Sequence, residues 1–285
     1  MARLRVAVHK FSSCDGCQMQ LLNMEQDLLT LAERVEIANF IEASSTVLPG
    51  PYDVSFVEGS VSTHEERERI RRIRAESRLL IAIGACATSG GIQALRNWGR
   101  HEAFLQAVYA TPETIDSLAQ STPFSEHVKV DAELYGCPPD PGQIKRVIAD
   151  LLAGVPPWVP TEAVCLQCKR DGNVCVLVAR GEPCLGPVTR TGCGALCPQQ
   201  ERDCYGCFGP QGGGNTTALG RRFLAPDIGL TPPEIVRRYR FIYNWAPAFR
   251  DGSQEWENPG PGMGPLPASG TDNSSPSGRG QGEGA

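Results

Sequence analysis

The distribution of twelve cysteines constrains this chain of 285 residues more than any other feature. Four of them lie far apart in the N-terminal half: Cys14, Cys17, Cys86 and Cys137. The other eight crowd into one short stretch: Cys165, Cys168, Cys175, Cys184, Cys193, Cys197, Cys204 and Cys207. Because one [4Fe–4S] cluster takes four thiolates, twelve cysteines match three clusters. The count therefore indicates a protein that holds iron–sulfur clusters and transfers electrons.

Disulfide bonds are a second use of cysteine, but they require an oxidising compartment. The N-terminus, MARLRVAVHKF, has neither a long apolar stretch nor a twin-arginine export signal. We therefore expect a cytoplasmic protein with reduced thiols. The net charge of −5, without a basic block, does not suggest nucleic-acid binding. No apolar run has the length that is needed to span a bilayer.

Structural zinc is the stronger alternative. The C-x-x-C pairs that begin at Cys165 and Cys204 together fit a zinc-ribbon pattern, although the gap between them is long. Zinc would also need a second site for the four cysteines between these pairs. Iron–sulfur binding suits the local sequence better, because Cys197 is followed by Pro198 and a Cys-Pro pair recurs at ferredoxin-type ligands.

Strand-like and helix-like segments alternate through the first 150 residues. We expect strands at Leu4 to Phe11, Val35 to Ile41, Val54 to Val57, Arg78 to Ile83 and Val128 to Val130. We expect a first helix from about Gly16 to Ala32. A second helix should follow the capping box Thr63-x-x-Glu66, with Ile70 and Ile73 inward. A third should follow Asp140, with an apolar stripe of Ile144, Val147, Ile148 and Leu151. This alternation predicts an α/β fold with a parallel, doubly wound sheet.

Three predicted strands each lead into a cysteine of the first set. Cys14, Cys86 and Cys137 follow the first strand, the strand that ends at Ile83, and the strand near Val130. Because ligands bind at the carboxyl ends of strands in open parallel sheets, these cysteines can converge on one site. Flanking glycines can allow the backbone to approach a cofactor closely, or each can simply form an ordinary turn: Gly16, Gly84, Gly90, Gly91 and Gly136.

The rest of the chain predicts two further parts. A small irregular iron–sulfur domain is expected over residues 156–257, after a first domain of residues 1–155. Within it, Thr231-Pro-Pro-Glu234 has the pattern of a helix start. From about Asn258 the chain is rich in Gly, Pro and Ser, so residues 258–285 are expected to form a disordered tail.

At this point the motifs resemble a known family, the small subunits of [NiFe] hydrogenases. The matching segments are Ser13-Cys14-Asp15-Gly16-Cys17-Gln18, Glu58-Gly59-Ser60-Val61, Gly84-Ala85-Cys86-Ala87-x-x-Gly90-Gly91 and Gly136-Cys137-Pro138-Pro139. The stretch from Cys175 to Cys193 is similar to the delta subunit of the cytoplasmic, NAD(P)-linked hydrogenases, which are also called sulfhydrogenases. The resemblance covers roughly residues 3–245.

The resemblance implies a flavodoxin-like first domain and three [4Fe–4S] clusters. The proximal cluster would take Cys14, Cys17, Cys86 and Cys137. The distal cluster would take Cys165, Cys168, Cys175 and Cys184, and the medial cluster Cys193, Cys197, Cys204 and Cys207. It further implies a large subunit with the nickel–iron centre, together with flavin- and NAD(P)-binding and ferredoxin-like electron-transfer subunits. Spacing alone permits other divisions of the last eight cysteines.

Four positions bear on how closely the family pattern is kept. Cys165 replaces a histidine of the respiratory members, and Cys197 is an additional thiolate where those members hold a three-iron cluster. Gln18 stands where relatives often have glutamate. Glu58 keeps a carboxylate near the expected site. It can serve as a proton relay or hydrogen-bond partner, or it can simply cap loop amides at a strand end.

Two other classes of protein remain as alternatives. One is the cluster-carrying subunit of a quinone-reducing respiratory complex. Such subunits resemble the first domain, but they typically carry adjacent cysteines in place of Cys14-x-x-Cys17 and lack the eight-cysteine stretch. The other is a zinc-binding interaction module without a redox role.

Overall fold

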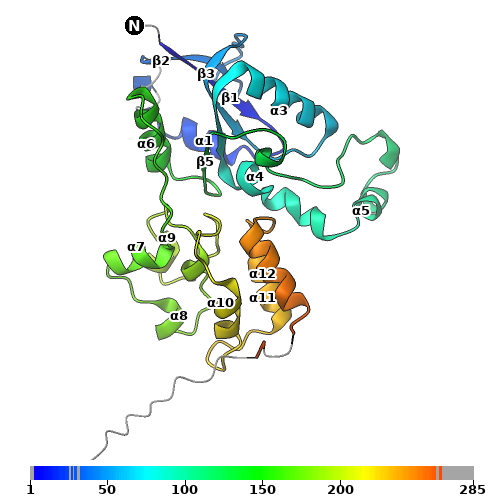
Figure 1. Cartoon of the computed structure of the whole chain (residues 1–285), viewed down its shortest axis with the longest axis vertical. Helices are drawn as coiled ribbons and strands as arrows, with labels where there is room; N and C mark the ends of the chain where they lie inside the picture. The colour runs from blue at the N-terminus through cyan, green and yellow to red at the C-terminus, as the bar shows by residue number, and fades with distance from the viewer. Residues whose placement is uncertain (1–2, 26, 28, 31–32, 261–262, 265–285) are drawn as a thin grey trace, which may run out of the picture.

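A parallel sheet forms the first part of the chain in the computed structural model (Figure 1). The structure describes residues 3–25, 27, 29–30, 33–260 and 263–264. The strands are β1 (Leu4–Lys10), β2 (Val35–Phe40), β3 (Tyr52–Glu58), β4 (Ser77–Ile83) and β5 (Ala132–Leu134). They lie in the order β2-β1-β3-β4-β5, and all neighbours are parallel. This is the strand order of flavodoxin-like folds, so the predicted fold class is confirmed.

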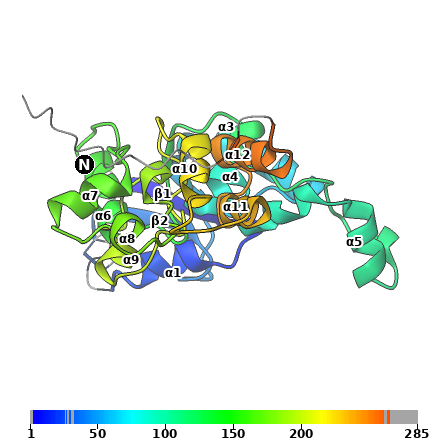
Figure 2. The same ribbon diagram turned by 90° about the horizontal axis from the view of Figure 1, so that it is seen from below.

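Helices cover both faces of the sheet. Helices α1 (Gly16–Leu22) and α6 (Pro141–Leu152) lie on the opposite side from α3 (His64–Glu76) (Figure 2). The core under α1 and α6 includes Leu21, Ile144, Val147, Phe56 and Ile81. The core under α3 includes Ile70, Ile73, Val57, Leu80 and Ala82. Buried on both faces, the strands read as near-continuous apolar runs, as in other parallel sheets.

The predicted helix starts at Thr63 and Asp140 are confirmed. The Thr63 side chain accepts a hydrogen bond from Glu66 N–H, and the Glu66 carboxylate accepts one from Thr63 N–H, which together form a capping box. The Asp140 carboxylate accepts a hydrogen bond from Gln143 N–H at 3.0 Å. Both caps satisfy amides at a helix N-terminus that have no partner within the helix.

The helix predicted from Gly16 to Ala32 is shorter in the structure. Helix α1 ends at Leu22, and Glu25 has a φ of 43°, which is incompatible with a continuous helix. The predicted end at Ala32 lies outside the described residues.

The fifth strand was predicted at the wrong place. Strand β5 is Ala132–Leu134, whereas Val128 and Val130 precede it. These two valines pack, partly buried, against the core under α3 without joining the ladder. These valines are apolar because they belong to a loop that packs on the core, and not because they form a strand. Pairing begins after Asp131, whose carboxylate accepts a hydrogen bond from Leu80 N–H.

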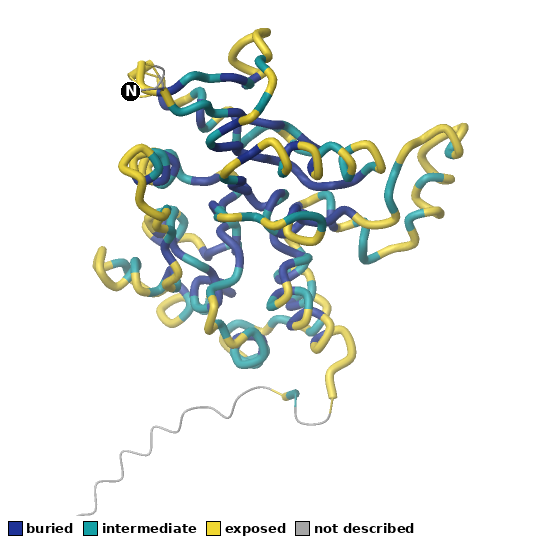
Figure 3. The backbone as a smooth tube through the Cα atoms, turned by 45° about the horizontal axis from the view of Figure 1, so that its top comes forward, coloured by how far each residue is buried: buried dark blue, intermediate teal, exposed yellow. Residues whose placement is uncertain are grey.

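A long excursion leaves the sheet between β4 and β5. It begins with α4 (Gly84–Ser89) and continues through η1 (Gly91–Trp98), α5 (His101–Val108), η2 (Pro112–Thr114) and η3 (Phe124–Glu126). Helix α5 stands away from the rest of the molecule (Figures 1 and 2) and contains no buried residue. Exposed and half-buried residues make up α5 and the segment that follows it, up to residue 120 (Figure 3).

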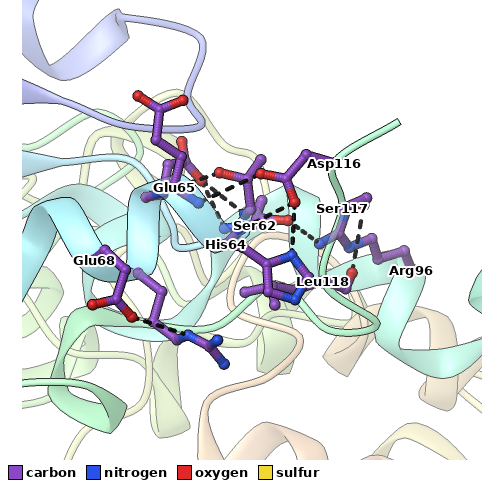
Figure 4. Close-up of polar contacts among 11 residues, drawn as sticks. Ser62, His64, Glu65, Glu68, Arg96, Asp116, Ser117 and Leu118 are labelled. Carbon is purple, nitrogen blue, oxygen red and sulfur yellow. Dashed lines mark hydrogen bonds and ion pairs between the residues drawn. The ribbon is translucent and has the colours of Figure 1, made fainter. Parts of the chain in front are cut away.

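Polar contacts fix the base of this excursion to the start of α3 (Figure 4). The Asp116 carboxylate accepts hydrogen bonds from the backbone N–H of His64 and lies 2.7 Å from the His64 ring. Arg96 donates hydrogen bonds to Ser117 Oγ and to the Ser62 carbonyl. The protruding segment is thus held at its root, where it meets the sheet.

The second part of the chain consists of short helices and loops (Figure 1). Its helices are α7 (Val164–Arg170), α8 (Val176–Ala179), η4 (Gly186–Val188), α9 (Leu196–Gln199), α10 (Thr216–Phe223), α11 (Pro232–Tyr239) and α12 (Pro247–Glu257). Helix α11 confirms the start predicted at Thr231. This part has its own core between α10, α11 and α12, which we call the second core. It includes Phe223, Ile235, Tyr239, Tyr243, Phe249 and Trp256.

Within the described part of the chain, no helix has the length and apolar character required to cross a membrane. Most of the tail predicted from Asn258 onward, residues 261–262 and 265–285, lies outside the described residues.

Candidate metal centres

All twelve cysteines are free thiols in the structure. Cys14 and Cys175 are exposed, Cys184 and Cys204 are buried, and the other eight are half-buried. Free thiols agree with a function as metal ligands, because iron and zinc both bind the thiolate.

The four cysteines of the N-terminal half lie at the carboxyl edge of the sheet. Cys14 and Cys17 follow β1, Cys86 lies in α4 directly after β4, and Cys137 follows β5. Burial raises the pKa of Cys17, and the neighbouring Cys86 and Cys137 raise it further. Burial also raises the pKa of Cys86 to about 12, with contributions from Cys137 and Cys14. The four residues that the resemblance assigned to a proximal cluster are therefore near enough to influence one another, and the cluster itself stays a prediction.

Two glycines leave room for the thiols of this group. Gly84 has a φ of +86°, and a Cβ there would overlap the Cys17 sulfur. Gly91 has a φ of +59°, and a Cβ there would lie 2.6 Å from the Cys86 sulfur. Both glycines are therefore required by backbone conformation and by the space that the sulfur atoms occupy.

Glu58 is buried beside the same cysteines. It is 1% exposed, and its carboxylate accepts hydrogen bonds from Ser13 Oγ at 2.9 Å and from Gln18 Nε2 at 2.8 Å. Burial raises the pKa of Glu58, while the hydrogen bonds from Ser13 and Gln18 lower it. Gln18 thus binds the carboxylate that the sequence singled out. A hydrogen-bonding function for Glu58 fits this geometry, and its proton-relay function stays a prediction.

A cavity of about 100 Å³ lies within the second part of the chain. Its lining includes all four cysteines assigned to the distal cluster: Cys165, Cys168, Cys175 and Cys184. Burial raises the pKa of Cys165 to about 11, and the other three cysteines contribute. The backbone N–H groups of Gly186 and Cys204 donate hydrogen bonds to the Cys184 sulfur, at 3.4 and 3.2 Å. N–H donors of this kind stabilise a thiolate or a cluster sulfur.

The remaining four cysteines also influence one another. Burial raises the pKa of Cys207 to about 12, and Cys193 and Cys197 are the next largest causes. Burial raises the pKa of Cys204 well above its usual value, and Cys207 is among the contributing neighbours. These are the residues that the sequence assigned to the medial cluster.

Three further effects connect the groups. Cys137 of the first group contributes to the pKa of Cys207. Burial is the largest cause of the raised pKa of Cys168, and Cys193 raises this pKa further. Burial is likewise the largest cause for Cys204, and Cys184 raises its pKa further. The medial group therefore has neighbours in both other groups.

The donor sets fit iron–sulfur clusters. Each predicted set offers four thiols. Glycines leave space beside two sulfur atoms of the first set, and the second set lines a cavity and includes a sulfur atom that accepts two backbone N–H hydrogen bonds. Across the described residues, no group of three or more His, Cys, Asp and Glu side chains is arranged to hold a single metal ion. The division into three ligand sets stays a prediction.

Sequence reasoning missed Gln93, which contacts one of the cysteines. Gln93 Oε1 accepts a hydrogen bond from the Cys86 thiol at 3.1 Å, and Gln93 Nε2 donates to the Ser12 carbonyl. Gln93 thereby connects the loops that carry Cys86 and Cys14. No spacing pattern marks this residue, because the contact with Ser12 depends on how the loops pack.

Comparison with known proteins identifies the family. The family model for the 20 kDa subunit of NADH ubiquinone oxidoreductase matches residues 14–151. Sulfhydrogenase 2 subunit delta of Pyrococcus furiosus is 36% identical over 242 residues, covering 85% of this chain and 100% of the relative. The delta subunit of the NAD-reducing hydrogenase of Cupriavidus necator is 31% identical over 174 residues, covering 56% of this chain and 83% of the relative.

A solved structure agrees with these relatives. One chain of the crystal structure of an NAD⁺-reducing [NiFe]-hydrogenase in the H2-reduced state superposes with a TM-score of 0.52 and 33% identity. The match covers 56% of this chain and 96% of that chain. With a full-length relative above one-third identity and a matching fold, this chain belongs to the small-subunit family of the [NiFe] hydrogenases.

Proposed function

We propose that this chain relays electrons through three [4Fe–4S] clusters within a cytoplasmic hydrogenase. The relay would connect the nickel–iron centre of a large subunit with a partner that carries a flavin and reduces NAD(P). The observation that supports the proposal most is that the twelve cysteines are free thiols and that members of each predicted set raise the pKa of others in the same set. We assign the sets as the sequence divides them, to a first domain of residues 1–155 and a second of residues 156–257.

The chain's own residues would bind the clusters and shield them from water. Four cysteines hold each cluster, which supplies one-electron transfer with little movement of its ligands. Because burial raises the pKa of most of these thiols, they stay protonated until iron is present, and binding releases their protons. N–H donors to the Cys184 sulfur and the glycines beside Cys17 and Cys86 determine the surroundings of sulfur.

Exposure of two cysteines supports two ends for the relay. Cys14 and Cys175 are the exposed members of the first and second predicted sets, and the third set has neighbours in both. The large subunit would bind beside Cys14 and the flavin-bearing partner beside Cys175, with reversible transfer between them. Cys165 in place of a histidine adds negative charge to the distal cluster, which lowers its potential and suits a low-potential flavin acceptor.

The proposal is tested by anaerobic purification of the native complex followed by metal analysis. This chain should contribute about twelve iron and twelve acid-labile sulfide atoms, from four per cluster, in addition to the metal and sulfide of its partner subunits. The protein should be brown and should bleach with dithionite. A colourless protein with stoichiometric zinc would instead support the zinc-binding module. Hydrogen-dependent reduction of NAD or NADP by the complex then tests the partner assignment.

A second candidate, a subunit of a quinone-reducing complex, is favoured by the family model that matches residues 14–151. The eight cysteines of the second part lie beyond this match. Co-purification of a quinone-reactive membrane complex, without hydrogen-dependent dye reduction, would support that candidate over a hydrogenase.

A further inference from the structure

One tyrosine of the second core contacts the cysteine-bearing loops at the carboxyl edge of the sheet. Tyr243 lies between α11 and α12, and its side chain is 1% exposed. We infer that Tyr243 is a positioning residue for the loops that carry Cys86 and Cys137, so that the second part of the chain determines the surroundings of the proximal cluster. This inference rests on the proposed function for the identity of that cluster.

The Tyr243 hydroxyl oxygen is an acceptor for both of these loops. It accepts a hydrogen bond from Gly136 N–H at 3.1 Å. It also accepts one from Thr88 Oγ1 at 3.2 Å. The Thr88 hydroxyl also donates to the Gly84 carbonyl, at 2.9 Å. Tyr243 and Thr88 therefore connect the backbone at Gly136 with the backbone at Gly84.

Both residues that donate to the Tyr243 hydroxyl are close in sequence to predicted ligands. Gly136 directly precedes Cys137, and Thr88 lies two residues after Cys86 in α4. The phenol thus connects two loops that come from different strands of the sheet. Burial raises the pKa of Tyr243 well above its usual value, so the hydroxyl stays neutral.

The ring of Tyr243 also packs against a third cysteine-bearing loop. A Cβ at Gly209 would lie 2.7 Å from the Tyr243 ring, and Gly209 is two residues after Cys207. The Tyr243 ring is also stacked with the ring of Tyr135, at a centroid distance of 6.1 Å. Tyr243 therefore occupies the space between the proximal and medial ligand sets.

The next residue reinforces the same attachment. Asn244 is fully buried, and its Nδ2 donates a hydrogen bond to the Gly91 carbonyl at 2.7 Å. Its Oδ1 accepts one from Trp98 Nε1 at 3.1 Å. Two consecutive side chains from the second core thus bind the backbone and side chains that follow Cys86.

The test compares Tyr243→Phe with Tyr239→Phe in the complete, anaerobically purified complex. Tyr239 is a matched control because it is equally buried in the same core, while its hydroxyl donates to the Thr216 carbonyl at 2.6 Å. Two measurements apply: the EPR spectrum and midpoint potential of each cluster, and hydrogen exchange of the peptide that covers residues 132–140.

In Tyr243→Phe we expect a shift in the g-values and midpoint potential of the proximal cluster, with the distal cluster unchanged. We also expect faster exchange at the Gly136 amide, because its acceptor is lost. Tyr239→Phe should leave both quantities at the wild-type value. The inference is overturned if Tyr243→Phe leaves the proximal signal and the exchange of this peptide unchanged, or if Tyr239→Phe changes them equally.

A second pair of variants applies if Tyr243→Phe fails to assemble. Thr88→Val removes the hydroxyl that donates to Tyr243 and nearly preserves the side-chain volume, whereas Thr88→Ser keeps the hydroxyl. Thr88→Val should shift the proximal signal, and Thr88→Ser should restore it. An unshifted signal in Thr88→Val would refute the positioning function. Absence of iron from the wild-type complex would refute the proposed function instead, and the hydrogen-exchange comparison would still decide whether Tyr243 positions the loop.

Discussion

Burial controls the chemistry of individual residues at the candidate metal centres. It is the largest cause of the raised pKa of Cys17, Cys86, Cys165 and Cys207. A buried thiolate is stable only beside positive charge, which bound iron supplies. The glycines nearby leave space for the sulfur atoms. Gly84, which has no side chain, leaves the space that the Cys17 sulfur occupies.

The first prediction concerns Gly84→Ala. The new Cβ would collide with the Cys17 sulfur, so the proximal cluster should be lost and the iron content should fall by about a third, one cluster of three. Gly154→Ala is the matched control, because Gly154 also has a positive φ, of +72°, with no atom within 4 Å of the new Cβ. The control should cost about 1–2 kcal/mol of stability from backbone strain and retain full iron. Equal iron content in both variants would contradict the prediction.

The second prediction concerns Cys197→Ala. Cys197 lies in α9 and is the proposed fourth ligand of the medial cluster. Without its thiolate this cluster should become a three-iron form while the chain still folds. Low-temperature EPR of the oxidised protein should then show a new three-iron signal. Full iron content with an unaltered spectrum would mean that Cys197 is not a ligand.

At the scale of elements, caps and polar contacts decide where helices begin. Helix α3 has a mostly charged surface and only Ile70 and Ile73 buried, so its start depends strongly on the capping box at Thr63. Asp116 adds a second acceptor for the amides of the first turn. The same contacts hold the root of the α5 excursion (Figure 4), so one helix end stabilises two elements.

The third prediction concerns Thr63→Ala. Loss of the side-chain oxygen leaves Glu66 N–H without its acceptor and should lower the free energy of unfolding by about 1 kcal/mol. Urea unfolding followed by circular dichroism measures the change. Thr63→Ser retains the oxygen and should unfold close to the wild-type midpoint. If Thr63→Ser lost as much stability as Thr63→Ala, the methyl group rather than the cap would be responsible.

At the scale of the whole molecule, the medial group lies next to both other groups. Cys137 and Cys207 are neighbours across the boundary between the sheet and the second part of the chain, as are Cys168 and Cys193 within the second part. This arrangement supports a continuous path for electrons. In such a path each cluster is necessary for transfer to the final acceptor but not for chemistry at the far end.

The fourth prediction separates the two ends of this path. Cys14→Ser weakens a proximal ligand, so the assembled complex should keep hydrogen–deuterium exchange at the partner's metal site and lose hydrogen-driven NAD(P) reduction. Cys175→Ser, at the other exposed end, should give the same two results but leave the proximal EPR signal intact. Gel filtration establishes that each complex is assembled. Near-wild-type rates in both assays for an assembled Cys14→Ser complex would refute the relay.

Several features of the fold could be predicted because their causes are local. Apolar runs marked β1 to β4 closely, and the capping pattern at Thr63 marked the start of α3. The positions of Val128 and Val130 misled the prediction of β5, because a β-branched residue has the same apolar character in a loop that packs on a core as in a strand. Helix α1 was overestimated for a similar reason, since helical spacing does not reveal the turn at Glu25.

The candidate ligands, the α/β class and the family could be inferred from the amino-acid sequence, because cysteine chemistry, strand–helix alternation and short motifs are properties of neighbouring residues. Which thiols are neighbours, and what surrounds them, depends on tertiary packing. Gly136 and Tyr243 are 107 residues apart, and Thr88 and Tyr243 are 155 apart. Contacts over such separations depend on the packing of the second core against the sheet, which no local pattern encodes.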